Sequence, residues 1–304
     1  MPKKIWKLGI IGWPLGYSLS PLMHRAALKT AGLSGDYKEI KVRATGLKKW
    51  MRTEALMLDG FNVTMPHKRA VASWLAASGE LQVDAAAGAK GSAATRFCAE
   101  SGATAVNTVV ARDGVLVGYN TDGPGFLQPL AAAPRWGSLK GAKAVLLGAG
   151  GAAEGIAGAL SNEVKVGRLT IWNRNPDRAE ELVKRINRRR PEVAQTVKEI
   201  VALPLEDADL VVNATPMGMA GKEEIPAGVL DHLYTGQVVV DIVYEPRETA
   251  LVRAARRKKC LVITGDEMLA AQGAMAFEIW TGVPAAQVLP AMKRALDEHF
   301  AARR

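Results

Sequence analysis

The sequence predicts an α/β fold with parallel sheets, divided between about two domains. Its 304 residues exceed the roughly 150 that a single domain commonly uses. Short apolar strands alternate along the chain with stretches of helical periodicity, which is the pattern of βαβ units. Thirty glycines against five phenylalanines also favour a fold with tight turns between strands and helices.

The first half of the chain reads as a strand–helix series that ends in a hairpin. The predicted elements are strand Trp6–Gly12, helix Leu22–Ala31, strand Tyr37–Val42, a helix around Leu47–Leu58, strand Phe61–Thr64 and a helix from His67. Strands Ala105–Ala111 and Val115–Tyr119 are expected to pair, because Asp113 and Gly114 between them favour a turn. The stretch 72–103 is rich in Ala, Gly and Ser and reads as an inserted loop or weak helix.

A second βαβ series follows. Its predicted elements are strand Ala144–Leu147, helix Ala152–Leu160, strand Leu169–Trp172, helix Asp177–Arg189, strands Leu210–Asn213 and Val238–Ile242, helix Glu248–Lys258, strand Leu261–Ile263, helix Glu267–Thr281 and a helix from about Pro284. Between the two series, Pro124, Pro129, Pro134 and Gly137 interrupt any regular pattern over 123–141. We therefore expect the domain boundary in that stretch.

The composition excludes several classes of protein. With 48% hydrophobic and 23% charged residues, the chain buries a large core, which excludes a disordered or fibrous protein. Two cysteines, Cys98 and Cys260, are too few for a disulfide framework or a structural zinc site and fit a reducing compartment. No apolar run approaches the roughly 18 residues of a membrane helix. We expect a cytoplasmic protein that does not associate with membranes.

The net charge of +10 indicates an anionic partner, either nucleic acid or a phosphorylated or carboxylated small molecule. The densest basic runs, 184–190 and 253–259, lie at the ends of predicted helices, where cations favour the helix dipole and face water. Aromatic residues do not interleave with them as a stacking platform for nucleic acid requires. We therefore expect a small molecule and no nucleic acid.

A glycine-rich loop follows the strand that ends at Leu147. It reads Gly148, Ala149, Gly150, Gly151, Ala152, Ala153 and opens a helix. In this G-x-G-x-x-A pattern, Gly148 permits a tight turn, Gly150 lets the backbone approach a pyrophosphate, and Ala153 keeps helix and sheet close. An ordinary glycine-rich turn is the alternative, but the strand–turn–helix–strand context favours a dinucleotide site, with the phosphates at the helix N-terminus.

The end of the next strand indicates which dinucleotide binds. A site for NAD usually has an Asp or Glu there, which bonds the ribose 2′-OH. This chain has Arg174 and Arg178 instead. One charge-assisted hydrogen bond to a 2′-phosphate is worth roughly 1.5–3 kcal/mol, or about 10- to 150-fold in affinity. The two arginines could be solvated residues at the start of a helix, but their position favours NADP.

Polar clusters in the first half also lie at strand ends, where open α/β sheets bind ligands. They span Ser18 to Pro21, Asn62 to Lys68 and Gly118 to Gly123. Each has an ordinary structural explanation: Ser20 before Pro21 is a natural helix N-cap, and Lys68 could be a solvated helix residue. Asp122 followed by glycine is a common turn. One cluster alone therefore indicates little.

Together with four further motifs, these clusters resemble the shikimate dehydrogenases. The further motifs are Ala105 to Thr108, Asn213 to Gly218, Asp241 to Pro246 and Met268 to Gly273, and all occur in the family's order between about Leu8 and Phe300. The resemblance implies an N-terminal α/β substrate domain over 1–122, rejoined by C-terminal helices in 266–304. It implies a Rossmann-like NADP-binding domain over 123–265.

The activity that the resemblance implies is the reversible reduction of 3-dehydroshikimate to shikimate with NADPH, a step towards chorismate and the aromatic amino acids. A relative that acts on quinate or an aminated shikimate analogue is the alternative, although Arg174 and Arg178 argue against an NAD-dependent quinate enzyme. An NADP-binding regulatory protein would keep the fold without the activity, but Lys68 and Asp122 are both present. A monomer or homodimer is expected.

The resemblance also implies roles for individual residues. Lys68 and Asp122 match the catalytic pair and also bind substrate. The other expected substrate-binding residues are Ser18, Ser20, Thr64, Asn107, Tyr244 and Gln272. The expected cofactor-binding residues are Gly148, Ala149, Gly150, Gly151 and Ala152 at the pyrophosphate, Asn173, Arg174 and Arg178 at the 2′-phosphate, and Ile242 and Gly265 at the nicotinamide end. No metal is expected, because the histidines show no ligand spacing.

The residue types suit this chemistry in their own right. Hydride addition to a ketone builds negative charge on oxygen, so a positioned cation that donates a proton lowers the barrier. Lys68 is expected to donate this proton, and Asp122 to orient it. The chain departs from the family at Tyr17, where a histidine is usual, and at Arg25, where an asparagine is common. Neither residue is assigned to the substrate.

Overall fold

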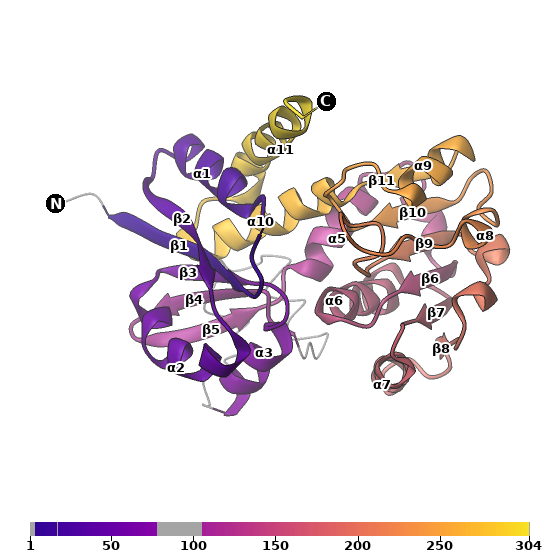
Figure 1. Cartoon of the computed structure of the whole chain (residues 1–304), viewed down its shortest axis with the longest axis horizontal. Helices are drawn as coiled ribbons and strands as arrows, with labels where there is room; N and C mark the ends of the chain where they lie inside the picture. Colours follow the sequence, from indigo (N-terminus) through magenta and orange to yellow (C-terminus); the bar gives the residue numbers. More distant parts are fainter. Residues whose placement is uncertain (1–3, 17, 78–104, 304) are drawn as a thin grey trace. The chain divides into compact units, whose positions relative to one another are not determined.

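The computed structural model describes residues 4–16, 18–77 and 105–303, and these form the α/β architecture that the sequence predicts (Figure 1). The chain divides into two compact units, one made of 1–125 with 270–304 and the other of 126–269. Each unit has its own sheet. Cys98 and most of the stretch 72–103 lie outside the described residues, as does Tyr17.

The first unit is built on a five-stranded mixed sheet with the strand order β2-β1-β3-β4-β5. The strands are β1 (Ile5–Gly12), β2 (Ser34–Lys41), β3 (Gly60–Val63), β4 (Thr108–Arg112) and β5 (Val115–Tyr119). The first three are parallel, whereas β4 runs antiparallel to both β3 and β5. The expected hairpin is therefore present, and Asp113 and Gly114 turn it with positive φ angles.

The helices of this unit include one place where the sequence-based expectation is wrong. They are α1 (Ser20–Thr30), α2 (Leu47–Arg52), α3 (Lys68–Ala77) and α11 (Ala285–Ala301), with the adjoining parts of α5 (Asp122–Ala131) and α10 (Gly265–Thr281). The single helix expected over 47–58 ends at Arg52, and a 3-10 turn follows over Glu54–Met57. The helix ends at Thr53, where the backbone leaves helical geometry and the hydroxyl donates to the Lys49 carbonyl at 3.0 Å, a contact that weakens a helix slightly.

The irregular stretch expected over 123–141 is also partly wrong, since α5 covers Asp122–Ala131. Pro124 lies in the first turn, where a missing N–H costs no intrahelical bond. Pro129 does lie inside the helix. The burial of Phe126 and Leu130, at 1% and 0% exposure, accounts for the helix despite that lost bond, because burying such a side chain gains about 1.5–3 kcal/mol.

The end of the chain, 270–304, belongs to the first unit. Trp280 of α10 donates its indole N–H to the Val109 carbonyl at 2.8 Å. Its ring lies over Gly60, where an added Cβ would come within 2.2 Å of it. Only glycine fits at position 60, so β3 is shaped to receive the returning helix.

The second unit is built on a six-stranded parallel sheet with the order β11-β10-β9-β6-β7-β8. The strands are β6 (Lys143–Leu147), β7 (Arg168–Trp172), β8 (Ala194–Thr196), β9 (Leu210–Asn213), β10 (Val238–Asp241) and β11 (Leu261–Ile263). From β6 the chain adds β7 and then β8 on one side, and it then returns to add β9 on the other side of β6. The strand order therefore reverses between β6 and β9. Ligands of open α/β sheets bind at such a reversal.

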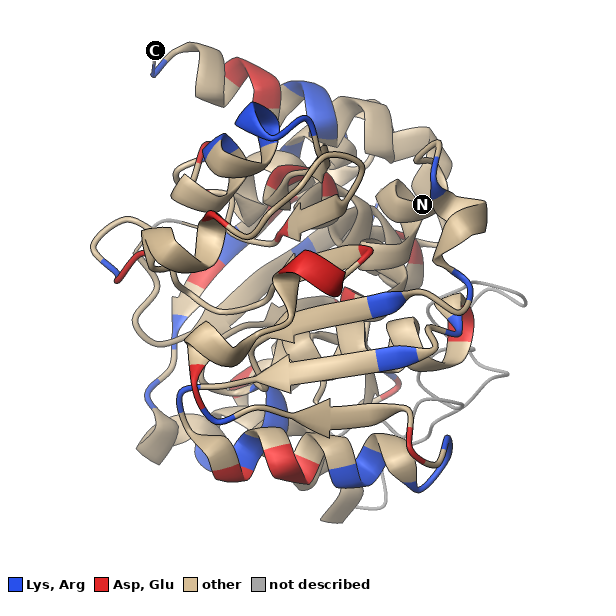
Figure 2. Ribbon diagram, turned by 90° about the vertical axis from the view of Figure 1, so that its right-hand side faces the viewer, with Lys and Arg blue, Asp and Glu red and all other residues tan. Residues whose placement is uncertain are grey.

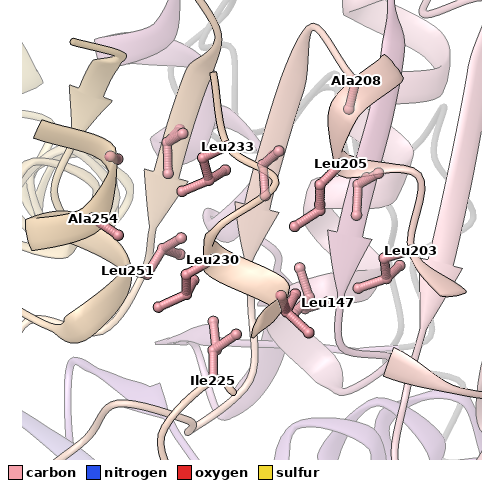
Figure 3. Packing of buried hydrophobic residues seen from close by; sticks show 14 of the residues in the cluster. Leu147, Leu203, Leu205, Ala208, Ile225, Leu230, Leu233, Leu251 and Ala254 are labelled. Carbon is pink, nitrogen blue, oxygen red and sulfur yellow. The ribbon is translucent and has the colours of Figure 1, made fainter. Parts of the chain in front are cut away.

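Short helices and an aliphatic core cover this sheet. The helices are α6 (Gly151–Ala159), α7 (Pro176–Asn187), α8 (Ala227–Leu230) and α9 (Ala250–Arg257). Leu147 of β6 packs in one buried cluster with Leu205, Leu230 and Leu251 (Figure 3). The sequence did not predict β8 or α8, because three or four residues are too few to show a period. No helix among the described residues is long and apolar enough to span a membrane.

His24 of α1 is fully buried in the core of the first unit. Its ring stacks on that of Tyr37 with 4.3 Å between the centroids, and the Trp280 ring lies 5.2 Å away. Burial lowers the pKa of His24 from 6.5 to about 3, although the Asn62 side chain acts in the opposite direction. The folded protein therefore holds this imidazole neutral, whereas the unfolded chain protonates it below about pH 6.5.

We expect His24 to make the protein less stable in acid. Between pH 6.5 and pH 3 the unfolded state binds the extra proton, so this residue lowers the free energy of unfolding by up to about 1.4 kcal/mol per pH unit. Urea unfolding of His24→Leu between pH 7 and pH 4 should show a shallower loss than the wild type. Exposed His232, replaced by Leu, is the control. Equal pH slopes in His24→Leu and wild type would contradict this account.

Candidate active site

The topology of the first sheet brings its polar clusters to one edge. Strands β1 and β3 are parallel, β4 is antiparallel to β3, and β5 is antiparallel to β4. The carboxyl ends of β1, β3 and β5 and the amino end of β4 therefore share an edge. Ser18 and Thr64 follow β1 and β3, Asn107 precedes β4, and Asp122 follows β5.

Lys68 and Asp122 form a shielded ion pair at this edge. The Lys68 Nζ donates to Asp122 Oδ2 at 2.6 Å, and the side chains are 16% and 6% exposed. Each is the first residue of its helix, α3 and α5 respectively. The backbone N–H of Asp122 donates to Asn120 Oδ1 at 2.9 Å, which fixes the start of α5. The pair places a cation and an anion side by side with little water around them.

Asn107 forms a hydrogen bond with the carboxylate of Asp122, through the oxygen that Lys68 does not contact. Its Oδ1 accepts the backbone N–H of Thr121 at 2.7 Å, and a backbone N–H can only donate. The amide orientation is thereby determined, and Nδ2 faces Asp122 Oδ1 at 2.9 Å. Gln272 of α10 joins the cluster, because its Oε1 accepts from Asn107 Nδ2 at 3.4 Å. The structure thus brings together four of the expected residues.

A second layer of buried polar groups, which sequence reasoning did not assign, supports Asn107. Asn62 Nδ2 donates to the Asn107 carbonyl at 3.1 Å and to Thr108 Oγ1 at 3.2 Å. The Tyr37 hydroxyl donates to Asn62 Oδ1 at 2.7 Å, and Thr108 Oγ1 donates to Asn107 Oδ1 at 3.1 Å. Asn62 and Thr108 lie inside motifs recognised in the sequence, so those motifs could have pointed to them. Tyr37 lies in no such motif, and the sequence gives no indication of its contact with Asn62.

The loops after β1 and β3 are joined to each other. Trp13 N–H donates to the Met65 carbonyl at 3.0 Å, and a Cβ at Gly12 would come within 2.5 Å of the Thr64 methyl. Ser20 is the first residue of α1, whose N-cap is Leu19, so the N-cap interpretation of Ser20 is wrong. Ser18 Oγ instead accepts the Ser20 N–H at 3.3 Å.

Ser18, Ser20 and Thr64 therefore lie at the edge that carries the ion pair. Within the described residues, no side-chain hydrogen bond connects these hydroxyl groups to Lys68 or Asp122. Their hydroxyl groups suit a ligand at the same edge, because each can donate to an anion.

The glycine loop of the second unit leaves room for a phosphate. Gly148 has a φ of +119°, and a Cβ there would come within 2.7 Å of the Ala214 carbonyl oxygen. A Cβ at Gly150, the N-cap of α6, would meet nothing within 4 Å. The first-turn N–H groups of a helix have no intrahelical acceptors and attract anions. A closed turn followed by open space at a helix start fits a pyrophosphate.

Asn173, just after β7, connects this loop to the two arginines. Its Oδ1 accepts the Ala149 N–H at 3.0 Å, and its Nδ2 donates to the Asn175 carbonyl at 2.8 Å. Arg174 and Arg178 are exposed, and neither forms an ion pair with a residue that the structure describes. Their guanidinium groups suit a phosphorylated ribose, since phosphate oxygens accept from the guanidinium fork.

The segment after β10 holds the remaining expected residues. Asp241 accepts from Asn213 Nδ2 at 2.9 Å, Thr249 Oγ1 at 2.6 Å and the Val243 N–H at 3.0 Å. Burial raises the pKa of Asp241 to about 6, against the effect of these hydrogen bonds. The first residue of α10, Gly265, would place a Cβ 2.5 Å from the Ile242 carbonyl oxygen.

This contact brings Ile242 and Gly265 together. Tyr244 is half-buried in the same segment and belongs to the second unit. The other expected substrate-binding residues all belong to the first unit.

Comparison with known proteins identifies one family, the shikimate dehydrogenases. Family models match three stretches of the chain: the shikimate dehydrogenase substrate binding domain over 10–88, shikimate / quinate 5-dehydrogenase over 131–261, and the shikimate 5'-dehydrogenase C-terminal domain over 265–296. The chain is 39% identical over 299 residues to the NADP(+) shikimate dehydrogenase of Moorella thermoacetica, covering 97% of this chain and 94% of that protein.

Solved structures of shikimate dehydrogenases also resemble this chain over nearly its whole length. A shikimate dehydrogenase crystallised with NADP+ superposes with a TM-score of 0.81 at 34% identity, covering 97% of this chain and 96% of that one. The shikimate 5-dehydrogenase of Thermus thermophilus, crystallised with NADP(H) and shikimate, gives a TM-score of 0.74 at 33% identity, covering 96% of this chain and 100% of that one.

The two loop glycines should respond differently to alanine. Gly148→Ala places a side chain at positive φ and against a carbonyl oxygen, so we expect it to lower the free energy of unfolding by about 2 kcal/mol or more. Gly150→Ala meets open space at a φ of −87° and should change it by less than about 0.5 kcal/mol. Chemical unfolding measures both. Equal decreases in the free energy of unfolding for the two variants would contradict the close approach of Gly148 to the Ala214 carbonyl oxygen.

Proposed function

The chain belongs to the shikimate dehydrogenase family, and we propose that it catalyses the reversible NADPH-dependent reduction of 3-dehydroshikimate to shikimate. The observation that carries this proposal is the Lys68–Asp122 ion pair, held at 2.6 Å on a sheet edge lined with hydroxyl and amide groups. Relatives named as NADP(+) shikimate dehydrogenases, which match 90% to 97% of this chain, support it. The reaction would serve the synthesis of chorismate and the aromatic amino acids.

Lys68 is the proton donor in the proposed reduction. NADPH, when bound, supplies the hydride to the carbonyl carbon. The carbonyl oxygen then gains negative charge, and the Lys68 ammonium gives it a proton and becomes a neutral amine. In the oxidation of shikimate the amine takes the hydroxyl proton back. Asp122 orients the ammonium through Oδ2, and its oxygens have further lone pairs that can accept a substrate hydroxyl.

The remaining groups at this edge bind and orient the substrate in our proposal. The hydroxyl groups of Ser18 and Ser20 donate to its carboxylate, because an anion needs donors. Thr64, Asn107, Tyr244 and Gln272 contact the carboxylate or the ring hydroxyls. Asn107 has one amide orientation, so its place in the site is set before substrate arrives.

The cofactor residues of the second unit fit NADP. In this proposal, backbone groups from Gly148 to Ala152 hold the pyrophosphate, Arg174, Arg178 and Asn173 hold the 2′-phosphate, and Ile242 and Gly265 lie at the nicotinamide end. The open space at Gly150 and the two exposed guanidinium groups support this assignment.

We also propose that the protein acts in the cytoplasm, as a monomer or homodimer, without binding nucleic acid. Helix α7 carries three acidic and three basic residues, and over the second unit basic and acidic residues are interspersed (Figure 2). A nucleic-acid surface would gather basic residues on one face.

Steady-state rates with shikimate and quinate, each with NADP and NAD, test the proposed function. We expect the highest kcat/KM with shikimate and NADP, read from the absorbance of the reduced nicotinamide. A preference for quinate with NAD would overturn both the substrate and the cofactor.

Replacing the proton donor should lower turnover more than binding. We expect Lys68→Ala to reduce kcat by roughly 10²- to 10⁴-fold with little change in KM, as the loss of a general acid does. Lys4→Ala is the matched control, since Lys4 forms an exposed ion pair with Asp59 in the same unit. Near-normal turnover of Lys68→Ala would remove Lys68 from the mechanism.

Removing the two exposed guanidinium groups should alter cofactor preference. We expect Arg174→Gln with Arg178→Gln to lower the NADP-to-NAD ratio of kcat/KM by at least about 10-fold, because each lost charge-assisted bond is worth roughly 10- to 150-fold. Arg168→Gln is the control, because Arg168 begins the same strand, β7, at its other end. An unchanged ratio in the double variant would contradict the assignment.

A further inference from the structure

A six-residue loop of the second unit, 242–247, carries two of the proposed ligand contacts, Ile242 and Tyr244. Its start is fixed to the sheet, because the Ile242 N–H donates to the Asn213 carbonyl at 3.0 Å and the Val243 N–H to the Asp241 carboxylate at 3.0 Å. Further along, the Glu245 carbonyl accepts the Ala220 N–H at 3.2 Å.

The far end of the loop is held by an ion pair. Arg247 Nη2 lies 2.7 Å from Asp266 Oδ2, and the side chains are 31% and 6% exposed. Asp266 directly follows Gly265, the residue whose missing side chain lets α10 approach the Ile242 and Val243 carbonyl oxygens. The pair and the glycine contact therefore connect the same loop to the same helix start.

Stability alone is a poor explanation for this pair. Burying a carboxylate costs several kcal/mol of solvation, and apolar residues of similar size are often as stabilising in such a place. Asp266 keeps its other oxygen, Oδ1, buried without a hydrogen bond from any described residue, which adds to that cost. A guanidinium–carboxylate contact does give direction, because it has a preferred geometry that an apolar contact lacks.

We propose that Arg247 and Asp266 are a positioning pair, which fixes the loop 242–247 against the start of α10 and so holds Tyr244, a proposed substrate-binding residue, in place. The inference rests on the proposed function for its kinetic consequence. In this proposal the pair acts only through the loop and takes no part in the proton or hydride transfer, so its effect should appear mainly in substrate binding.

The double variant Arg247→Met with Asp266→Leu separates positioning from folding. It replaces the pair by apolar side chains, so we expect a Tm close to that of the wild type, a KM for shikimate raised about 5- to 10-fold, and kcat changed less than 3-fold. Arg247→Lys keeps a positive charge on the loop, so its KM for shikimate should lie between those of the wild type and the double variant. The control is Arg256→Met, which breaks the exposed ion pair between Arg256 and Glu248 on and beside α9.

A second readout needs no activity. Asp266→Asn leaves Arg247 in place but removes the charge that holds it, so trypsin should cut the native protein after Arg247 faster than it cuts the wild type or Arg256→Met. An unchanged KM in the folded double variant, or an unchanged rate of cutting in Asp266→Asn, would overturn the inference. Failure of the proposed function would appear differently, as a wild type that does not oxidise shikimate, and the trypsin result would still decide whether the pair holds the loop.

Discussion

The candidate site of this protein depends on one interaction, the shielded ion pair between Lys68 and Asp122. The two residues are far apart in the chain and meet because β3 and β5 end at the same edge of the first sheet. An ion pair with little water around it is costly unless its remaining donors and acceptors are satisfied. Asn107 meets this need on the carboxylate side, and the buried layer of Tyr37, Asn62 and Thr108 holds Asn107 in turn.

In the second unit, the candidate cofactor site depends on glycines, whose lack of a side chain allows close backbone approach or leaves open space. Gly148 permits a turn that a Cβ would obstruct, and Gly150 leaves open space at the start of α6. Gly265 lets a helix start touch backbone carbonyl oxygens. Asn173 then ties the glycine loop to the residues after β7. Backbone groups and two exposed guanidinium groups remain for an anionic ligand.

Much of the fold could be predicted from the sequence because its strands and longer helices have clear periods. The glycine loop after β6 and the hairpin at Asp113 and Gly114 are local features, and local sequence was enough to find them. The end of α2 at Thr53 is a single-residue change of backbone geometry, which a periodic pattern does not show. The helix α5 depends on the burial of Phe126 and Leu130, which proline-containing sequence does not reveal.

The candidate site was predicted chiefly through motifs, and the assignments of its residues stay predictions. Motifs pointed to Lys68, Asn107, Asp122 and Gln272, which the structure brings together. They could not reveal that Tyr37 supports Asn107, since that depends on a buried contact between distant segments. The Arg247–Asp266 pair was likewise invisible, because nothing local links the two positions.

A crystal structure of the protein with NADP+ and shikimate tests the central claim most directly. We expect Lys68 Nζ to lie within about 3 Å of the hydroxyl oxygen that is oxidised, at hydrogen-bond distance, with Asp122 still in contact with Lys68. A shikimate molecule whose reactive hydroxyl faces another side chain, with the lysine out of reach, would contradict it.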